Sequence, residues 1–406
     1  MADIFELRDI EVWDGNMAAS HALRQAQVDV VAAYPITPST PIVENYASFM
    51  ANGYIDGEFV MAESEHGAMS CCIGASAAGG RVATATSSQG FALMLETLYS
   101  ASGMRLPIVL NVVNRAIGAP LNVNGDHSDM YMGRDSGWIQ IDCYNPQDVY
   151  DMNLVAFRVS EDHGIRLPAM VHQDGFMTSH TAQRVKTLSD DVAYDFIGEF
   201  KPMNDMLDLD HPVTHGVQTE EDWHFEHKAR QHHALMSAVL PKIQEAFDGL
   251  KALTGRQYNL VESYTMDDAE IAIVCMGTSV ETAQEVSNEL RAQGIKAGVV
   301  GIRVFRPFPL EQIADALKGC KAIATLDRSS PNGTVGALYN ELAGALFNTD
   351  THAVLTNYIY GLGGRDLTKS SIHTIYRDLQ ANAQAGSPTT PLQQFIGLRG
   401  PKLSFF

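Results

Sequence analysis

The sequence predicts an α/β protein: a doubly wound, mostly parallel sheet, followed by a smaller C-terminal α/β domain. Between Asn16 and Asp174, short β-branched runs alternate with stretches of helical character, and the alternation resumes after Gly255. The run 107–113 has almost no polar side chain, as expected for a parallel strand that helices cover on both faces. In such folds, sites form at the loops that leave the carboxyl ends of the strands.

The first unit divides into elements in chain order. Asn16 is placed to cap a helix. Pro35, Pro38 and Pro41 disfavour a helix and indicate an exposed loop. The expected helices span 17–27, 63–78 and 90–103, and the expected strands span 28–33, 59–61, 82–86, 107–113 and 168–172.

An irregular connector rich in Asp and Pro follows, over residues 185–222. A long helix is expected from Asp222 to about Leu253. It carries His224 and His227, whose spacing would suit two metal ligands on one face, but neither His232 nor His233 completes a convincing set. We therefore assign no metal-ligating residue.

The second unit repeats the alternating pattern. Its expected strands span 270–276, 296–302, 322–327 and 352–360, and its expected helices span 280–293 and 335–347. We place the domain boundary after the long helix. The expected domains are residues 1–255, which include the connector, and residues 256–406.

The charge balance excludes several classes of protein. With 28 Lys and Arg against 48 Asp and Glu, the formal net charge is −20. A surface that tracks phosphate backbones or anionic lipids would need clustered cations, so we expect neither nucleic acid nor membrane as a partner. No apolar stretch reaches the ~20 residues that span a bilayer. The N-terminal residues 1–16 lack the apolar core of a signal peptide, so we expect a soluble, cytoplasmic protein.

Five cysteines (Cys71, Cys72, Cys143, Cys275, Cys320) are scattered in mostly apolar surroundings, and no CxxC spacing occurs. The usual ligand spacing of an iron–sulfur cluster or zinc knuckle is therefore missing, and buried free thiols are expected. The loops Gly277-x-Ser279 and Gly333-x-x-Gly336 complete neither a dinucleotide fingerprint nor a P-loop. A nucleophile elbow is also absent.

Three polar loops at strand ends remain as candidates. The turn from Tyr34 to Thr40 presents hydroxyls, although any one of them could simply cap a helix. The segment from Glu63 to Gly67 starts an apolar, glycine-containing helix, where a buried carboxyl at Glu65 would suit general acid–base work. Two acids in a first turn can also merely complement the helix dipole. Arg115 follows the apolar strand 107–113 and could clamp a carboxylate or form a structural ion pair.

These loops, in this order, resemble the α subunits of 2-oxoacid:ferredoxin oxidoreductases, and most closely those that act on pyruvate. The resemblance extends over about residues 16–366. It rests on Tyr34-Pro-Ile-Thr-Pro-Ser-Thr-Pro41, Glu63-Ser-Glu-His-Gly67, Thr84-Ala-Thr-Ser-Ser-Gln-Gly90, Asn114-Arg-Ala116, Gly125-Asp-His-Ser-Asp129, Asp174-Gly-Phe176, Arg306-Pro-Phe-Pro309, Asp327-Arg-Ser329 and Gly361-Leu-Gly-Gly-Arg-Asp366. The first of these motifs is the specific one.

The resemblance implies a thiamine-diphosphate fold, with residues 1–255 as the pyrimidine-binding domain and residues 256–406 as a transketolase-C-like domain. Glu65 stands where the family's glutamate hydrogen-bonds the aminopyrimidine ring, and Ser88, Gln89 and Gly90 would complete the cofactor site. Thr37 and Arg115 would bind the substrate carboxylate and carbonyl region. Glu65, Thr37 and Arg115 are therefore the expected catalytic residues, and the cofactor carries the difficult chemical step.

The same resemblance places the remaining parts on other chains. Thiamine diphosphate would be shared with a β subunit that carries the Mg²⁺–diphosphate site, and [4Fe-4S] clusters would lie on partner subunits. The implied partners are β, γ and ferredoxin-like δ subunits or fused equivalents, with pyruvate, CoA and ferredoxin as reactants and a dimer of the heteromeric unit as the assembly. The chain alone is expected to be inactive. The alternatives are the same chemistry on 2-oxoisovalerate or 2-oxoglutarate, or a non-catalytic structural subunit.

Overall fold

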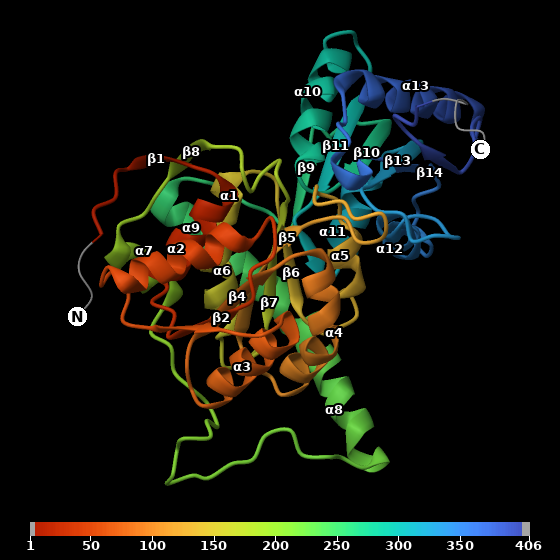
Figure 1. Cartoon of the computed structure of the whole chain (residues 1–406). Coiled ribbons are helices and arrows are strands. Elements are labelled where there is room, and N and C mark those ends of the chain that lie inside the picture. The colour runs from red at the N-terminus through yellow and green to blue at the C-terminus, as the bar shows by residue number, and fades with distance from the viewer. Residues whose placement is uncertain (1–4, 400–406) are drawn as a thin grey trace.

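The computed structural model describes residues 5–399, in which two large sheets lie side by side (Figure 1). The first sheet has seven strands in the order β12-β6-β7-β5-β4-β2-β3, all parallel except β12. Its strands are β2 Val30–Ala33, β3 Glu58–Met61, β4 Val82–Thr86, β5 Ile108–Asn114, β6 Ile139–Cys143, β7 Ala169–Asp174 and β12 Val304–Arg306.

Helices cover both faces of this sheet, so the predicted doubly wound architecture is confirmed. One face packs against helices α1, α2 and α6, and the other face against α3 and α4. The bounds are α1 Gly15–Gln25, α2 Thr40–Ala51, α3 Glu65–Ala77, α4 Ser88–Gly103, the short α5 Ser128–Met132 and α6 Pro146–Ser160.

Two local predictions in this unit were wrong. The N-cap of α1 is Asp14, whose side chain accepts a hydrogen bond from Met17 N at 2.8 Å. Asn16 instead lies inside the helix and donates from Nδ2 to the carbonyl of Pro38 at 2.9 Å. Pro41 lies in the first turn of α2, where backbone N–H groups have no acceptor within the helix. A proline, which lacks the N–H, is therefore tolerated there, and Pro41 starts the helix rather than excluding it.

The connector is more ordered than expected. Its first part forms β8 Gln183–Lys186, which pairs antiparallel with β1 Ile10–Trp13, and α7 Asp190–Ile197. The expected long helix is present as α8 Glu221–Ala234, a π-helical turn Leu235–Val239 and α9 Leu240–Thr254. Pro241 has no N–H to donate, so the α-helical ladder is interrupted just before it. Helix α8 points away from the body of the molecule (Figure 1).

The second sheet has the strand order β15-β14-β13-β10-β11-β9. Helices α10 and α13 pack on one of its faces, and α11 and α12 pack toward the main core. The bounds are β9 Val261–Tyr264, β10 Ile271–Cys275, α10 Ser279–Arg291, β11 Ala297–Ile302, α11 Leu310–Leu317, β13 Ala322–Asp327, α12 Ala337–Leu346, β14 Val354–Ile359, the 3₁₀ turn Leu362–Gly364, α13 Lys369–Ala385 and β15 Gln393–Phe395.

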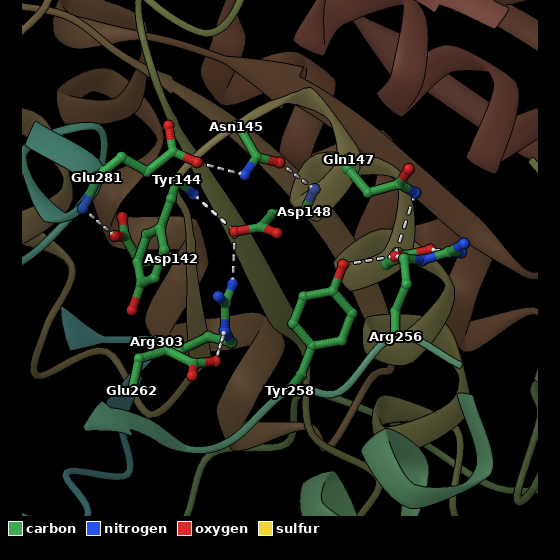
Figure 2. A network of polar contacts seen from close by, with 12 residues as sticks. Asp142, Tyr144, Asn145, Gln147, Asp148, Arg256, Tyr258, Glu262, Glu281 and Arg303 are labelled. Atoms are coloured by element: carbon green, nitrogen blue, oxygen red, sulfur yellow. Dashed lines mark hydrogen bonds and ion pairs between the residues drawn. The ribbon is translucent and has the colours of Figure 1, made fainter. Parts of the chain in front are cut away.

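A buried polar network joins the two units (Figure 2). Arg303 is 3% exposed and lies between the rings of Tyr144 and Tyr258, 4.2 and 4.8 Å from their centres. Its guanidinium binds Asp148 at 2.7 Å and Glu262 at 3.3 Å. Next to it, Arg256 and the Tyr258 hydroxyl bind Asp151.

The domain boundary at residue 255 stays a prediction, and the first four and last seven residues of the two expected domains lie outside the described residues. The structure adds one fact that bears on it: β12, from the second unit, closes the edge of the first sheet by pairing with β6. Within residues 5–399, no helix combines the length and the apolar character needed to cross a bilayer.

Candidate active site

The candidate residues lie at one edge of the first sheet. Strands β2, β3, β4 and β5 are parallel, so the loops that follow them all leave the sheet at its carboxyl edge. Thr37 lies in the loop after β2 and Arg115 directly after β5. Glu65 and Ser88 are the first residues of the helices that follow β3 and β4.

Glu65 is the first residue of α3, and Ser64 caps that helix by accepting a hydrogen bond from Gly67 N at 3.1 Å. The cap leaves the Glu65 side chain free to turn into the protein, where the residue is only 6% exposed. Among the described residues, no group donates a hydrogen bond to its carboxylate. The residue as a whole is largely buried, but its carboxylate oxygens are not, so a ligand that donates a hydrogen bond can reach them.

Gly90 lies directly against Glu65. A Cβ atom at this position would come within 2.4 Å of Glu65 Oε1 and 2.6 Å of Thr86 Oγ1, so only glycine leaves room for the carboxylate. The hydroxyls of Thr86 and Ser87 are buried and have no hydrogen-bond partner in the described part of the chain. The site therefore offers one acceptor and two further polar groups to a ligand with mixed donors and acceptors, which is the character of an aminopyrimidine ring.

Arg115 has no carboxylate partner within 4.0 Å in residues 5–399, so the structural ion pair that the sequence left open does not form. Its Nη1 donates to the carbonyl of Thr37 at 2.8 Å, and its Nε approaches the carbonyl of Asn122 at 3.4 Å. Burial lowers the pKa of Arg115, and the charge of Asp129 partly offsets that effect. The guanidinium is thus held in place while its charge is left for an anionic ligand.

The other predicted residues, Thr37 and Ser88, contact the site in different ways. Thr37 touches Arg115 through its backbone, and its side chain is exposed. Ser88 is buried at φ +50°, and its hydroxyl has two acceptors for its one hydrogen, Gln89 Oε1 at 2.5 Å and the carbonyl of Ala116 at 2.6 Å. Ser88 therefore joins two of the loops, and its contact with a cofactor, like that of Gln89, stays a prediction.

Asp129 is a residue that the sequence analysis did not single out. Its Oδ2 accepts hydrogen bonds from the backbone amides of Ser88 at 2.8 Å and Arg115 at 2.9 Å, and its Oδ1 accepts from Asn114 Nδ2 at 2.9 Å. Burial raises the pKa of Asp129 to about 6, although these hydrogen bonds favour the charged form. Asp129 fixes the loops after β4 and β5 relative to each other.

A second buried network joins this edge to the C-terminal unit. Asp174, at the end of β7, binds His127 Nε2 at 2.7 Å and Arg328 Nη1 at 2.9 Å, and it accepts from Thr278 N at 2.9 Å. Burial acts to raise the pKa of Asp174, but the charges of Arg328 and His127 outweigh it and hold the pKa below its usual range. Gly277 has φ +63°, and a Cβ there would lie 2.7 Å from Asp174 Oδ2, so this contact requires glycine.

Large apolar side chains are exposed on the elements that carry the candidate site. They extend from the loops after β2, β5 and β7, from the end of β3 and from the start of α4. These exposed residues are Tyr34, Met61, Leu93, Leu121, Val123 and Met177. A set of exposed apolar side chains around a polar site is typical of a surface that another chain covers.

The structure also reports on the cysteines and histidines. Four of the five cysteines are buried, as expected, and Cys71 is partly exposed. Burial raises the pKa of Cys72, Cys275 and Cys320 to about 12, so these thiols are inert near neutral pH. Over the described residues 5–399, no group of three or more His, Cys, Asp or Glu side chains is arranged to hold a metal ion.

Solved structures of other proteins share this fold. The structure matches 2-oxoglutarate:ferredoxin oxidoreductase from Magnetococcus marinus with a TM-score of 0.70 and 20% identity, covering 93% of this chain and 67% of that one. It matches a split-gene transketolase β4 tetramer chain with a TM-score of 0.53 and 14% identity, over 92% and 98% of the two chains. The fold is therefore of the transketolase-like, thiamine-diphosphate-binding class, as predicted.

Residues 21–246 match the family model "Pyruvate flavodoxin/ferredoxin oxidoreductase, thiamine diP-bdg", and residues 269–372 match "Pyruvate:ferredoxin oxidoreductase core domain II". The chain belongs to the pyruvate:ferredoxin oxidoreductase family, which confirms the resemblance read from the motifs. It is 44% identical to pyruvate synthase subunit PorA of Thermotoga maritima, over 95% of this chain and 97% of that protein. It is 41% identical to ketoisovalerate oxidoreductase subunit VorA of Pyrococcus abyssi, over 93% and 95%.

Proposed function

We propose that this chain is the α-type subunit of a cytoplasmic pyruvate:ferredoxin oxidoreductase complex. The complex would convert pyruvate and CoA reversibly to acetyl-CoA and CO₂, with electrons passed to ferredoxin. The observation that carries the proposal is the largely buried Glu65 against Gly90, whose carboxylate accepts no hydrogen bond from the described residues, in a family whose model describes thiamine diphosphate binding. The similarity to pyruvate synthase subunits favours pyruvate as the substrate.

Thiamine diphosphate, when bound, supplies the nucleophilic carbon and accepts the electron pair released on loss of CO₂. This chain would hold its aminopyrimidine half: the Glu65 carboxylate would accept a hydrogen bond from the ring, and the Thr86 and Ser87 hydroxyls would meet its other polar atoms. Arg115 would bind the substrate carboxylate through its guanidinium, which forms no ion pair with an acidic residue of the described chain. Thr37, beside it, would contact the substrate carbonyl region.

We propose that partner subunits complete the site. The exposed apolar side chains around it support a covering chain, which we assign as the β subunit that holds the diphosphate, Mg²⁺ and a cluster. The γ and ferredoxin-like δ subunits would contribute CoA binding and the further [4Fe-4S] clusters. The proposed assembly is a dimer of this heteromeric unit.

The substrate can be tested on the complex isolated through a tag on this chain. CoA-dependent reduction of a viologen dye is measured with pyruvate, 2-oxoisovalerate and 2-oxoglutarate, and we expect the highest kcat/KM for pyruvate. The similarity to VorA makes 2-oxoisovalerate the second candidate, and a preference for it would retain the chemistry and change the substrate. No turnover of any of these acids, by a complex that retains thiamine diphosphate, would favour a structural subunit.

The role of Glu65 can be tested in the same assay. Glu65→Gln should lower kcat by about 10²–10⁴-fold, because the amide no longer offers a carboxylate to the cofactor ring. Glu63→Gln, two residues earlier and exposed, is the matched control and should leave the rate unchanged. A Glu65→Gln complex with near-normal activity would refute the assignment.

The role of Arg115 is tested in the same assay. Arg115→Ala should raise KM for the 2-oxo acid more than it lowers kcat, because the guanidinium would mainly bind the substrate carboxylate.

A further inference from the structure

A large cavity lies far from the candidate active site, at the opposite edge of the first sheet. Its volume is about 1020 Å³. It is open to solvent and is bordered by the C-terminal end of α4, the turn before β7, the connector loop and the middle of α8. Helix α4 has 16 residues, so its two ends lie about 24 Å apart; Ser88 marks the active-site end and Met104 the cavity end.

The lining of this cavity is strongly cationic. It includes Arg105, Arg166, Lys228 and Arg230 and no aspartate or glutamate. The whole chain has 48 acidic and 28 basic residues, so the charge of this lining is opposite in sign to the net charge of the chain. The cavity therefore offers a local positive field on an acidic protein.

None of these four side chains forms an ion pair within the described residues, although the charge of Glu161 favours the charged form of Arg166. None of them has a carboxylate within 4.0 Å in residues 5–399, whereas Glu161, the acid that most affects Arg166, is bound to Arg81 at 2.8 Å. Glu226 precedes Arg230 by one helical turn without reaching it. Burial lowers the pKa of Arg105, and the charge of Arg230 lowers it further, so like charges face each other without a counterion.

Arg166 gives the second, independent observation. The residue is 4% exposed, and its Nε is buried without a hydrogen-bond partner within the described chain. Its Nη1 reaches only the carbonyl of Lys201, at 3.5 Å. A charged donor that is buried and unpaired is costly, and a bound anion would remove that cost. Arg105, in contrast, already donates to the carbonyls of Ile165 and Arg166.

The remaining walls hold the cavity open and add apolar surface. His227 Nε2 contacts the carbonyl of Gly103 at 2.6 Å and His215 Nε2 contacts that of Asn204 at 2.8 Å, which ties α8 and the connector loop in place. Tyr99, Met104 and Val217 supply apolar surface beside the cations. The volume is that of a site for a small organic ligand.

We propose that this cavity binds a small anion that carries phosphate groups, such as a nucleotide or another phosphorylated metabolite. Guanidinium forks match phosphate oxygens, and a ligand with two or more negative charges would offset several of the four cations at once. This proposal does not depend on the proposed catalytic function, because the cavity and the active site lie at opposite edges of the sheet.

Thermal unfolding and calorimetric titration of the full-length chain test the proposal. The probes are inorganic phosphate, pyrophosphate, ADP and adenosine, each against KCl of equal ionic strength. ADP and pyrophosphate should bind and raise Tm, and adenosine should not. Equal affinity for ADP and pyrophosphate would support recognition of the phosphates alone, and tighter binding of ADP would support a nucleotide.

Two variants localise the binding. Arg230→Gln, at an exposed position that tolerates substitution, and Arg166→Gln should each weaken binding at least about tenfold. Arg184→Gln, on the exposed face of β8, removes one positive charge elsewhere and should leave binding unchanged. Failure of all phosphate probes to bind at millimolar concentration, or binding that Arg230→Gln does not weaken, would overturn the proposal and leave these cations to an acidic segment of a partner.

Discussion

At the scale of single residues, Asp129 determines the geometry of the candidate site without being one of its predicted ligand-binding groups. Its two oxygens accept from the amides of Ser88 and Arg115 and from the side chain of Asn114. A carboxylate is suited to this position because each of these three groups is a donor. The position of Arg115 thus depends on an acid in the short helix α5, which follows it in the chain.

Asp129→Asn should therefore be destabilising although it preserves shape. One carboxylate oxygen becomes an NH₂ group that faces backbone donors, and the free energy of unfolding should fall by about 2–3 kcal/mol. Urea unfolding at pH 8 measures the change. Asp135→Asn, an exposed acid six residues later, is the control and should change stability by less than about 0.5 kcal/mol. A change as small for Asp129→Asn would exclude this role.

The sequence identified Glu65 and Arg115 but not Asp129 or Asp174, and the reason is physical. A carboxyl in an apolar helix and an arginine after an apolar strand both stand out from their local surroundings. Asp129 and Asp174 gain their importance from partners 41 and 154 residues away, Ser88 and Arg328. Such contacts carry no local pattern, although both residues stood within motifs of the family resemblance.

At the scale of elements, β7 shows what a fully buried strand can contain. All six residues of this strand are buried, and both ring nitrogens of His172 have no hydrogen-bond partner in the described structure. Burial, aided by the charge of His127, lowers the pKa of His172 to about 3. The folded protein therefore keeps this ring neutral at pH values where the unfolded chain is protonated.

This difference makes the fold sensitive to acid. With an unfolded pKa near 6.5, the unfolded chain takes up a proton that the folded chain excludes, so stability falls as pH drops from about 6.5 to about 3. His172→Leu should lower the slope of the free energy of unfolding against pH in this range by up to about 1.4 kcal/mol per pH unit, the contribution of one proton. It should not lower the free energy of unfolding at pH 8. Urea unfolding between pH 4 and pH 8 measures it, with exposed His233→Leu as the control; parallel pH profiles for His172→Leu and wild type would contradict it.

Strands and helices with plain apolar patterns were predicted closely, and those at 82–86 and 322–327 match to the residue. The sequence pattern predicted no element over β6 and α6. Strand β6 contains Gln140 and Asp142, which are buried polar residues that break the apolar run, and Asp142 is satisfied by Gly277 N from the other unit at 2.5 Å. Helix α6 is buried on almost all sides and has no polar face to mark its period.

At the scale of the whole molecule, the two units are held together by Arg303 and its neighbours (Figure 2). Arg303→Ala would leave the buried Asp148 without its cation and empty the space between two tyrosine rings. The free energy of unfolding should fall by about 3–5 kcal/mol. Lys296→Ala breaks a more exposed pair with Glu270 and should cost at most about 1 kcal/mol. Urea unfolding followed by tryptophan fluorescence compares the two, and equal losses would contradict a special role for Arg303.

Strand β12 has a consequence for how this chain can be divided. The first sheet ends on β6, and the strand that covers this edge comes from residues 304–306, far beyond the expected domain boundary. A fragment that stopped at residue 255 would expose the backbone amides and carbonyls of β6, whose five residues are all buried in the full chain, and an open strand edge is a template for aggregation. If the gene were split at that boundary, the N-terminal product would have an unpaired strand edge that favours aggregation. Solubility of the first unit therefore favours encoding both units in one reading frame.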